Sequence, residues 1–294
     1  MSWPCLDAAR HQSRGPRQPV RLAEDGAQLG SVDPAAAAAL AAWPRWFQHD
    51  GAAWCITIDA AMRDAALAEV HAALRTHGLV RAWRDEPFTW WADGGTPAAV
   101  IERAATRFWG ALTLGAHANG YVADPASGRP THLWIARRAW DKPTDPGRLD
   151  NLIGAGVPRG QTPFQALQRE AWEEAGLLTG ELVELTRGRV VELACDIAEG
   201  WQHEWLFVYD LALSPGRVPQ NQDGEVAEHR LLPVDEALRR AAAGEMTTDA
   251  ALATLDFALR HQLLSPAESA RLAPRFEALC VAPARAAAFD PPGS

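Results

Sequence analysis

The pattern of hydrophobic and polar positions divides the chain into two modules. In the first, apolar residues recur at helical spacing over residues 60–76, with Ala66, Val70 and Leu74 on one side. The same module contains a predicted hairpin and a second predicted helix, at residues 20–32 and 97–108. We interpret residues 17–112 as a small α+β domain and residues 1–16 as a flexible tail that precedes it.

The second module alternates extended runs with helical ones. Strands are predicted at residues 116–122, 132–138, 189–197 and 204–213, and helices between Thr162 and Gly176 and at 234–243. We assign these elements to one domain, residues 113–246. Two further helical runs, at 251–264 and 266–279, predict a C-terminal helical extension over residues 247–294.

The helix between Thr162 and Gly176 carries three acidic residues on one face. Glu170, Glu173 and Glu174 stand at positions i, i+3 and i+4, so their charges repel each other unless a cation lies among them. A hard divalent cation suits oxygen ligands, and Mg²⁺ fits best when phosphates supply the remaining ligands. The competing interpretation is a solvated acidic surface, which is the common role of a Glu-rich helix.

The flanks of this helix support the prediction of a ligand site. Thr162 begins a capping box, and Gly176 supplies a C-terminal stop. Gly154, Gly156 and Gly160 precede the helix and predict a loop that approaches a ligand closely.

Composition excludes several classes of protein. The net charge of −9 argues against general nucleic-acid binding, which needs a positive surface. No run approaches the ~18 apolar residues of a membrane helix. Four scattered cysteines without a CxxC pair favour reduced thiols and a cytoplasmic protein. Most of the 13 tryptophans are expected in the core, but Trp83, Trp90 and Trp91 are also candidates for a flat wall against an aromatic ligand.

The stretch Arg169–Leu177, REAWEEAGL, resembles the second half of the Nudix box. The first half departs from the box twice, because Ala155 replaces a glycine and Gln161 replaces a glutamate, which predicts the loss of a weak or outer metal contact. The resemblance implies an α/β/α sandwich around a mixed sheet and hydrolysis of a diphosphate linked to another group.

The same resemblance implies roles for individual residues. Glu170 and Glu174 would be the principal ligands of Mg²⁺ or Mn²⁺, Glu173 would be a further ligand, and Arg169 would orient a glutamate of the box. A general base outside the box would be one of three glutamates, each of which is also a plausible surface acid: Glu204, Glu225 and Glu228.

A narrower resemblance covers residues 17–235 and rests on pieces such as HANGY at 117–121 and LWIARR at 133–138. Over these residues the chain resembles the thiamine pyrophosphokinase-related Nudix branch, whose members have a DUF4743-type N-terminal domain. It implies hydrolysis of thiamine diphosphate derivatives, especially oxidised ones, to the monophosphate and phosphate. The candidate substrate-binding residues are His117, Asn119, Arg137, Lys142, Asn151 and Gly154, although the cations also suit a surface and the polar residues a sheet edge.

Two other functions stay open from the sequence. The substrate is alternatively a nucleotide diphosphate derivative such as ADP-ribose, because tryptophans stack on adenine as readily as on a pyrimidine. The protein is alternatively a non-catalytic binding module, because Gln161 and Ala155 depart from the box. The expected partner is a small-molecule diphosphate rather than a nucleic acid or a membrane, and a homodimer is expected only by analogy.

Overall fold

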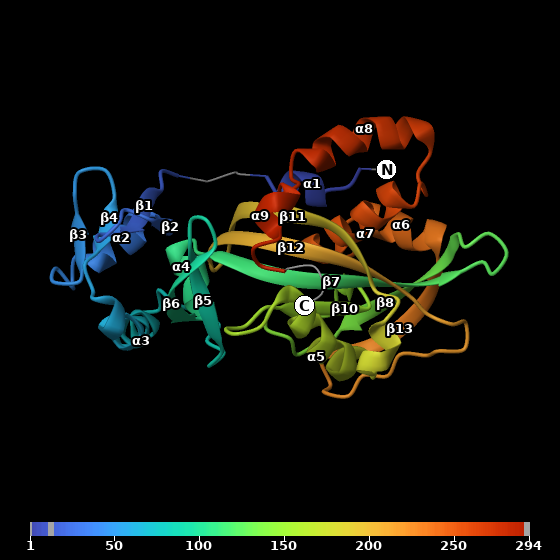
Figure 1. Cartoon of the computed structure of the whole chain (residues 1–294), viewed down its shortest axis with the longest axis horizontal. Coiled ribbons are helices and arrows are strands. Elements are labelled where there is room, and N and C mark those ends of the chain that lie inside the picture. Colours follow the sequence, from blue (N-terminus) through green and yellow to red (C-terminus); the bar gives the residue numbers. More distant parts are fainter. Residues whose placement is uncertain (1, 11–14, 291–294) are drawn as a thin grey trace.

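The computed structural model describes residues 2–10 and 15–290, which form two bodies joined along one side (Figure 1). The smaller, N-terminal body contains a four-stranded sheet in the order β2-β1-β4-β3 and a separate hairpin of β5 and β6. Its strands are β1 (Gln18–Leu22), β2 (Gln28–Val32), β3 (Phe47–His49), β4 (Trp54–Ile56), β5 (Pro87–Ala92) and β6 (Thr96–Glu102). Its helices are α2 (Pro34–Leu40), α3 (Ala60–Thr76), η1 (Arg103–Ala105) and α4 (Thr106–Trp109).

Most of the local predictions for this body hold, with one exception. The hairpin of β1 and β2 and the helix α3 are confirmed. The helix predicted at 97–108 is wrong for its first half, which is strand β6 paired antiparallel with β5. Phe88 lies opposite Ile101 in this pairing, and both side chains are buried. Packing across the hairpin therefore outweighs the helical preference of the alanines at 98 and 99.

The larger body is built on a mixed sheet in the order β11-β12-β7-β8-β13, in which β12 runs parallel to β7. The strands are β7 (Leu112–Ala123), β8 (Pro130–Arg138), β9 (Leu149–Asp150), β10 (Ile153–Gly156), β11 (Thr186–Ile197), β12 (Gly200–Ala212) and β13 (Val226–Pro233). Residues 120–123 of β7 pair with β8, whereas residues 115–118 pair with β10, and the far end of β8 pairs with β9. The two central strands therefore diverge, and the chain from β9 to β10 lies in the split between them.

Helices cover both faces of this sheet (Figure 1). One face packs against α5 (Pro163–Ala175) and the other against α6 (Val234–Ala242) and α7 (Thr248–Arg260). Side chains alternate along β12, so that Trp205 and Phe207 join the core beneath α5 while Leu206 and Val208 join the core beneath α7. The predicted fold class, a mixed sheet between helices with a preceding α+β domain, is confirmed.

Both ends of the chain pack against the larger body. Residues 2–10, which contain α1 (Cys5–Ala8), differ from the expected flexible tail, because Trp3 is 0% exposed and Ala9 accepts a hydrogen bond from Ala194 N. The remaining helices are η2 (Thr179–Leu182), α8 (Pro266–Glu277) and α9 (Pro283–Ala286). The predicted C-terminal extension is part of the core, since α7 and α8 share one cluster of buried side chains with the sheet.

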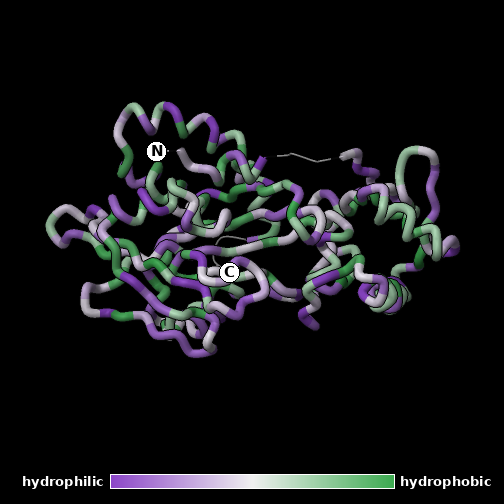
Figure 2. The backbone as a smooth tube through the Cα atoms, turned by 180° about the vertical axis from the view of Figure 1, so that it is seen from behind, coloured by the Kyte–Doolittle hydropathy of each residue, from purple (hydrophilic) through white to green (hydrophobic). Residues whose placement is uncertain are grey.

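Hydrophobic stretches run through the interior strands of the larger body, and its outer loops are mostly hydrophilic (Figure 2). Within residues 2–10 and 15–290, the structure has no helix with the length and apolar character that a membrane crossing requires.

Candidate active site

The caps of helix α5 fix where it begins and ends, and its apolar inner face fixes the direction in which its acidic residues point. Thr162 Oγ1 accepts a hydrogen bond from Gln165 N at 3.2 Å, and Gln165 Oε1 accepts one from Thr162 N at 2.9 Å, so the predicted capping box is confirmed. Gly176 ends the helix with φ +64°. The apolar stripe, which includes the buried Ala171, faces the sheet, and the glutamates therefore face the split between the strands.

Glu174 reaches the main chain at the split. Its Oε2 accepts a hydrogen bond from Gly154 N at 2.8 Å, and the residue is only 7% exposed. Gly154 lies in strand β10, opposite His117, so the predicted glycine loop is a strand at Gly154 and Gly156. A Cβ at Gly154 would stand 3.2 Å from His117 Cε1 and 3.5 Å from Asp150 Oδ1. The absence of a side chain at Gly154 therefore leaves room for the side chains of His117, Asp150 and Glu174 to meet beside it.

Two of the helix carboxylates are buried beside each other. Burial raises the pKa of Glu170 to about 7, and the neighbouring Glu173 acts in the same direction. Burial, Glu170 and Asp150 all raise the pKa of Glu174. Arg169 lies between Glu170 and Glu173, at 2.8 Å and 2.5 Å from their carboxylate oxygens. Arg169 therefore forms its ion pairs with Glu170 and Glu173, and Glu174 is held by Gly154 N.

Asp223 joins the acidic cluster from a distant loop. Gln222 N donates to Glu173 O at 2.8 Å and Gln220 N to Ala175 O at 2.9 Å, which fixes the loop against the end of α5. One carboxylate oxygen each from Glu170, Glu173 and Asp223 lies within 4.8 Å of the others. Sequence reasoning missed Asp223, because only the return of this loop to α5 brings the residue to the site. The adjacent turn residue Gly224 was its one local signal.

Lys142 and Glu225 lie at the same place. Lys142 forms an ion pair with Glu225, and the lysine side chain is only 14% exposed. Burial and Arg138 lower the pKa of Lys142, while the charges of Glu174, Glu170 and Asp223 oppose this effect. The loop between β8 and β9 therefore places a cation beside the glutamates of α5.

Arg138, rather than Arg137, is directed toward the split. Arg138 Nη1 donates to Asp150 Oδ2 at 3.0 Å. Arg137 Nε donates to Glu228 Oε1 at 2.7 Å and its Nη1 to Gly147 O at 2.7 Å, so its donors are engaged elsewhere. Neighbouring residues of β8 point in opposite directions, so Arg138 bonds to Asp150, whereas Arg137, the candidate named from the sequence, bonds to Glu228 and Gly147.

A buried polar network lies directly behind Gly154. His117 Nδ1 is 2.9 Å from Asn151 Oδ1, and Asn151 Nδ2 donates to Asn119 Oδ1 at 3.0 Å. Asn119 Nδ2 donates in turn to Ala253 O of α7 at 3.2 Å. Both asparagines are 2% exposed, and their predicted contact with the substrate stays a prediction. They support His117 from behind.

The three glutamates considered as the base occupy different places. Glu204 lies above Gly115, accepts hydrogen bonds from Gln202 at 3.0 Å and Arg107 at 3.4 Å, and faces the α7 side of β12. Arg137 and Arg230 hold Glu228 and lower its pKa. Glu225 alone among the three pairs with Lys142, beside the acidic cluster.

The donor set suits a hard divalent cation. Carboxylate oxygens of Glu170, Glu173 and Asp223 lie close enough to share one ion, and the buried Glu174 adjoins them on the same face of α5. Burial without full pairing is unfavourable for these carboxylates, and a cation would relieve it. Gln161 precedes the N-cap of α5 by one residue, before the first turn, whereas the carboxylates stand in the second half of the helix. Its change from glutamate therefore leaves the cluster of carboxylates intact.

Comparisons with known proteins agree with this geometry. Residues 117–251 match the family model of the NUDIX domain, and residues 5–113 match that of a domain of unknown function, DUF4743. The chain carries a Nudix domain. The split strands and α5 with its glutamates lie within this Nudix domain, and the smaller body corresponds to the DUF4743 match.

Two curated relatives match about two thirds of this chain. The chain is 34% identical over 207 residues to Nudix hydrolase 24, chloroplastic, of Arabidopsis thaliana, covering 69% of this chain and 56% of the relative. It is 31% identical over 202 residues to the uncharacterized protein YJR142W of Saccharomyces cerevisiae, covering 64% and 58%. The chain thus spans somewhat more than half the length of these relatives. Among solved structures, DR0079 of Deinococcus radiodurans is similar, with 24% identity, a TM-score of 0.44, and coverage of 58% of this chain and 99% of that one.

Proposed function

We propose that the Nudix domain is a metal-dependent diphosphatase that hydrolyses a thiamine diphosphate-like compound, in particular an oxidised form, to the monophosphate and phosphate. The observation that carries the proposal is the burial of Glu170 and Glu174 at the split, with a carboxylate oxygen of Glu173 and one of Asp223 near Glu170. A purely solvated acidic face would leave these side chains exposed. The side chain of Glu170 is instead 14% exposed, and Glu174 is 7% exposed.

Glu170, Glu173, Glu174 and Asp223 would hold Mg²⁺ or Mn²⁺. When bound there, the ion neutralises phosphate charge and polarises the attacking water. Arg169 keeps Glu170 and Glu173 in place through its two ion pairs. Gly154 N fixes Glu174.

Cations at the split suit the diphosphate itself. Lys142 and Arg138 approach it from the loop after β8 and from the end of β8, and both lie near acidic groups of the site. On binding of a diphosphate, Lys142 and Arg138 would exchange their carboxylate partners for phosphate oxygens. Phosphate oxygens are strong acceptors for such cationic donors. Glu225 is our choice for the general base, because its pairing with Lys142 keeps it at the acidic cluster.

The substrate class rests on the resemblance of residues 17–235 to the thiamine pyrophosphokinase-related branch. A substrate of this class offers a diphosphate to the α5 carboxylates and a polar heterocycle to His117, whose ring adjoins Gly154 and Asp150. Nucleotide diphosphate derivatives such as ADP-ribose are the second candidate, because they offer the same two features.

The test is a comparison of substrates with the full chain. Phosphate and monophosphate products would be measured with thiamine diphosphate, oxythiamine diphosphate, oxothiamine diphosphate and ADP-ribose, each with Mg²⁺ and with Mn²⁺. The proposal expects the highest kcat/KM for an oxidised thiamine diphosphate. A preference for ADP-ribose with release of AMP would replace the substrate class, and binding without turnover of any compound would show a non-catalytic module.

A further inference from the structure

A cavity lies between the two bodies of the protein, with a volume of about 520 Å³. Segments that are distant in sequence line it: residues 28–31 of β2, residues 91–95 at the turn of the β5–β6 hairpin, Gly110 and Leu112 at the start of β7, Ala194 of β11, alternate residues of β12, and Ala284, Arg285, Ala288 and Phe289 near α9. We call it the junction cavity. Its volume is within the range of about 300–1,000 Å³ that is usual for small-molecule sites.

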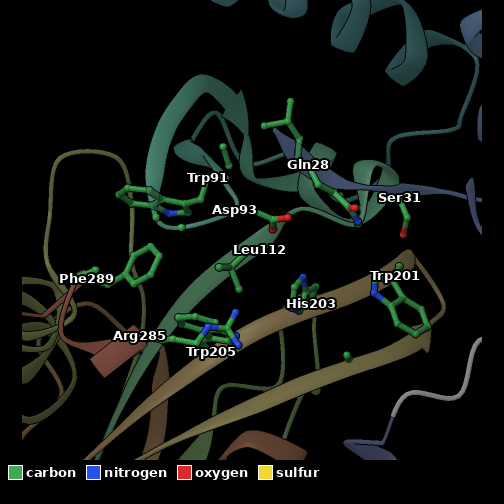
Figure 3. Close-up of a pocket in the computed structure, with 18 of the residues that line it drawn as sticks. Gln28, Ser31, Trp91, Asp93, Leu112, Trp201, His203, Trp205, Arg285 and Phe289 are labelled. Carbon is green, nitrogen blue, oxygen red and sulfur yellow. The ribbon is translucent and has the colours of Figure 1, made fainter. Parts of the chain in front are cut away.

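Aromatic rings form the walls of the junction cavity (Figure 3). Phe289 makes edge-to-face contacts with Trp91 at 5.0 Å and with Trp205 at 5.3 Å between ring centroids. Trp201 stands at the opposite end, with Leu112 and His203 between (Figure 3). Of the three tryptophans that the sequence singled out, Trp91 alone lines this cavity, since Trp90 is fully buried and Trp83 donates a hydrogen bond to Asp85. Such walls suit a flat ring.

The polar groups of the cavity are of two kinds. His203 Nε2 and Trp205 Nε1 share Glu192 Oε1 as a partner, at 3.0 Å and 3.2 Å, so they are held in place by the protein. Arg285 lies over the ring of Trp205, 4.9 Å from its centroid, and Asp93 faces the cavity from the hairpin (Figure 3). Within residues 2–10 and 15–290, neither Arg285 nor Asp93 has an ion pair or a side-chain hydrogen bond. One cation and one anion are therefore free for a ligand.

The junction cavity is separate from the acidic site. Trp201, His203 and Trp205 face the cavity at the end of β12 where His203 pairs with Leu112, whereas Gly154, which holds Glu174, pairs with His117 farther along β7. None of the acidic residues of α5 lines the cavity. A substrate whose diphosphate is held by α5 therefore does not account for these aromatic walls.

We propose that the junction cavity binds a heteroaromatic monophosphate at a site distinct from the acidic one. The flat ring would lie against the wall that Trp91, Trp205 and Phe289 form, with a positive or hydrogen-bond-donating edge toward Asp93, and the phosphate would meet Arg285. Compounds of this class include the products of both substrates considered for the acidic site. Binding in the cavity does not require that site to be active, so the two proposals fail independently.

The test is calorimetric titration of the full chain with thiamine monophosphate and, separately, with AMP, in EDTA so that no divalent metal recruits phosphate to α5. We expect saturable binding of at least one probe at one site per chain. Ala288→Trp, which adds a large side chain to an exposed residue of the cavity lining, should weaken it at least tenfold. Ala287→Trp, at the exposed neighbour that does not line the cavity, should leave it unchanged.

Arg285→Gln provides a second test that leaves the shape of the cavity unchanged and should weaken binding of the same probe severalfold. Glu174→Gln should have no effect on the titration, because Glu174 belongs to the other site. The proposal is overturned if neither probe binds, or if Ala288→Trp and Arg285→Gln both bind as the unmodified protein does. It is also overturned if Glu174→Gln abolishes binding, which would place the probe at the acidic site.

Discussion

His117 Nδ1 lies 2.9 Å from Asn151 Oδ1, and a chain of hydrogen bonds that ends at Asp210 fixes the direction of this contact. Asp210, a carboxylate held by Arg260, accepts from Asn119 Nδ2 at 3.2 Å. Asn119 must therefore turn its Oδ1 to Asn151, whose Nδ2 donates to it at 3.0 Å. Asn151 then presents its Oδ1 to the imidazole, so His117 must be the donor at Nδ1.

Neutral His117 is consequently expected to carry its proton on Nδ1, which leaves Nε2 as an acceptor. Long-range ¹⁵N–¹H NMR correlations of the histidine ring distinguish the two tautomers directly. Replacement of the carboxamide in Asn151→Leu should release the ring and restore a mixture of tautomers. A proton on Nε2 in the unmodified protein would contradict this interpretation of the network.

Asp223 is expected to contribute to metal binding although the Nudix box does not contain it. Its carboxylate lies near those of Glu170 and Glu173. Asp223→Asn keeps the size of the side chain and removes a charged ligand, so Mn²⁺ affinity should fall about tenfold, or roughly 1.4 kcal/mol. Asp235→Asn, at an exposed residue in the first turn of α6, serves as the control. Equal Mn²⁺ affinities of the two variants by titration would exclude Asp223 from the site.

The contrast between Glu170 and Asp223 shows what the sequence could and could not predict. The spacing of the glutamates on α5 and the caps of the helix are local features, and the structure reproduces both. The position of Asp223 depends on a loop that returns to the end of α5 from β12, and periodicity does not report such long-range contacts. The same limit explains β6, where pairing with β5 decided the conformation.

The buried terminal segment shows a second limit. Trp3 is fully buried in the same core cluster as side chains of α6 and α7, and its N donates to Ala242 O of α6, although the arginines and prolines around it are typical of a loose tail. Arg138 and Arg137 are equally basic, and only the direction of each side chain from β8 distinguishes the partner of Asp150 from the partner of Glu228.

Stability of the metal-free protein should depend on the ionisation of Glu170. Its pKa of about 7 in the folded state exceeds the ordinary value of 4.5, so the contribution of this group to stability is fully present below about pH 4.5 and is lost as the pH rises through 7. Glu170→Gln cannot ionise and should not show this loss. Between about pH 5 and pH 8, its free energy of unfolding should therefore rise relative to that of the unmodified protein by on the order of 1–3 kcal/mol.

Chemical denaturation in EDTA at these two pH values measures this difference. Saturating Mn²⁺ should reverse the trend, because the metal competes with the proton and binds more tightly as the pH rises. A difference between the two proteins that does not change with pH would show that Glu170 is already ionised without metal.

His71 is expected to make the N-terminal body sensitive to acid. Burial lowers its pKa to about 3, and Trp109 Nε1 donates to His71 Nε2 at 2.8 Å, which requires that nitrogen to be unprotonated. The contribution of this histidine to stability is therefore fully present above about pH 6.5 and is lost as the pH falls toward 3. His71→Gln keeps an acceptor for Trp109 but cannot take up a proton.

The unfolding temperature of His71→Gln should accordingly fall less steeply between pH 7 and pH 4 than that of the unmodified protein. Near-ultraviolet circular dichroism follows the tryptophans of this body during the transition. Parallel pH profiles for the two proteins would mean that other groups control its acid unfolding.

The central claim is that the carboxylates of α5 hold a metal for hydrolysis, and Glu174→Gln tests it most directly. This change keeps an oxygen for Gly154 N while it removes the charge, so the fold should persist. We expect the rate of phosphate release from the preferred diphosphate, with Mg²⁺ or Mn²⁺, to fall at least about 100-fold. Glu184→Gln, an exposed glutamate beyond the helix, should retain the rate of the unmodified protein. A Glu174→Gln protein that is folded and retains nearly the full rate would contradict the account.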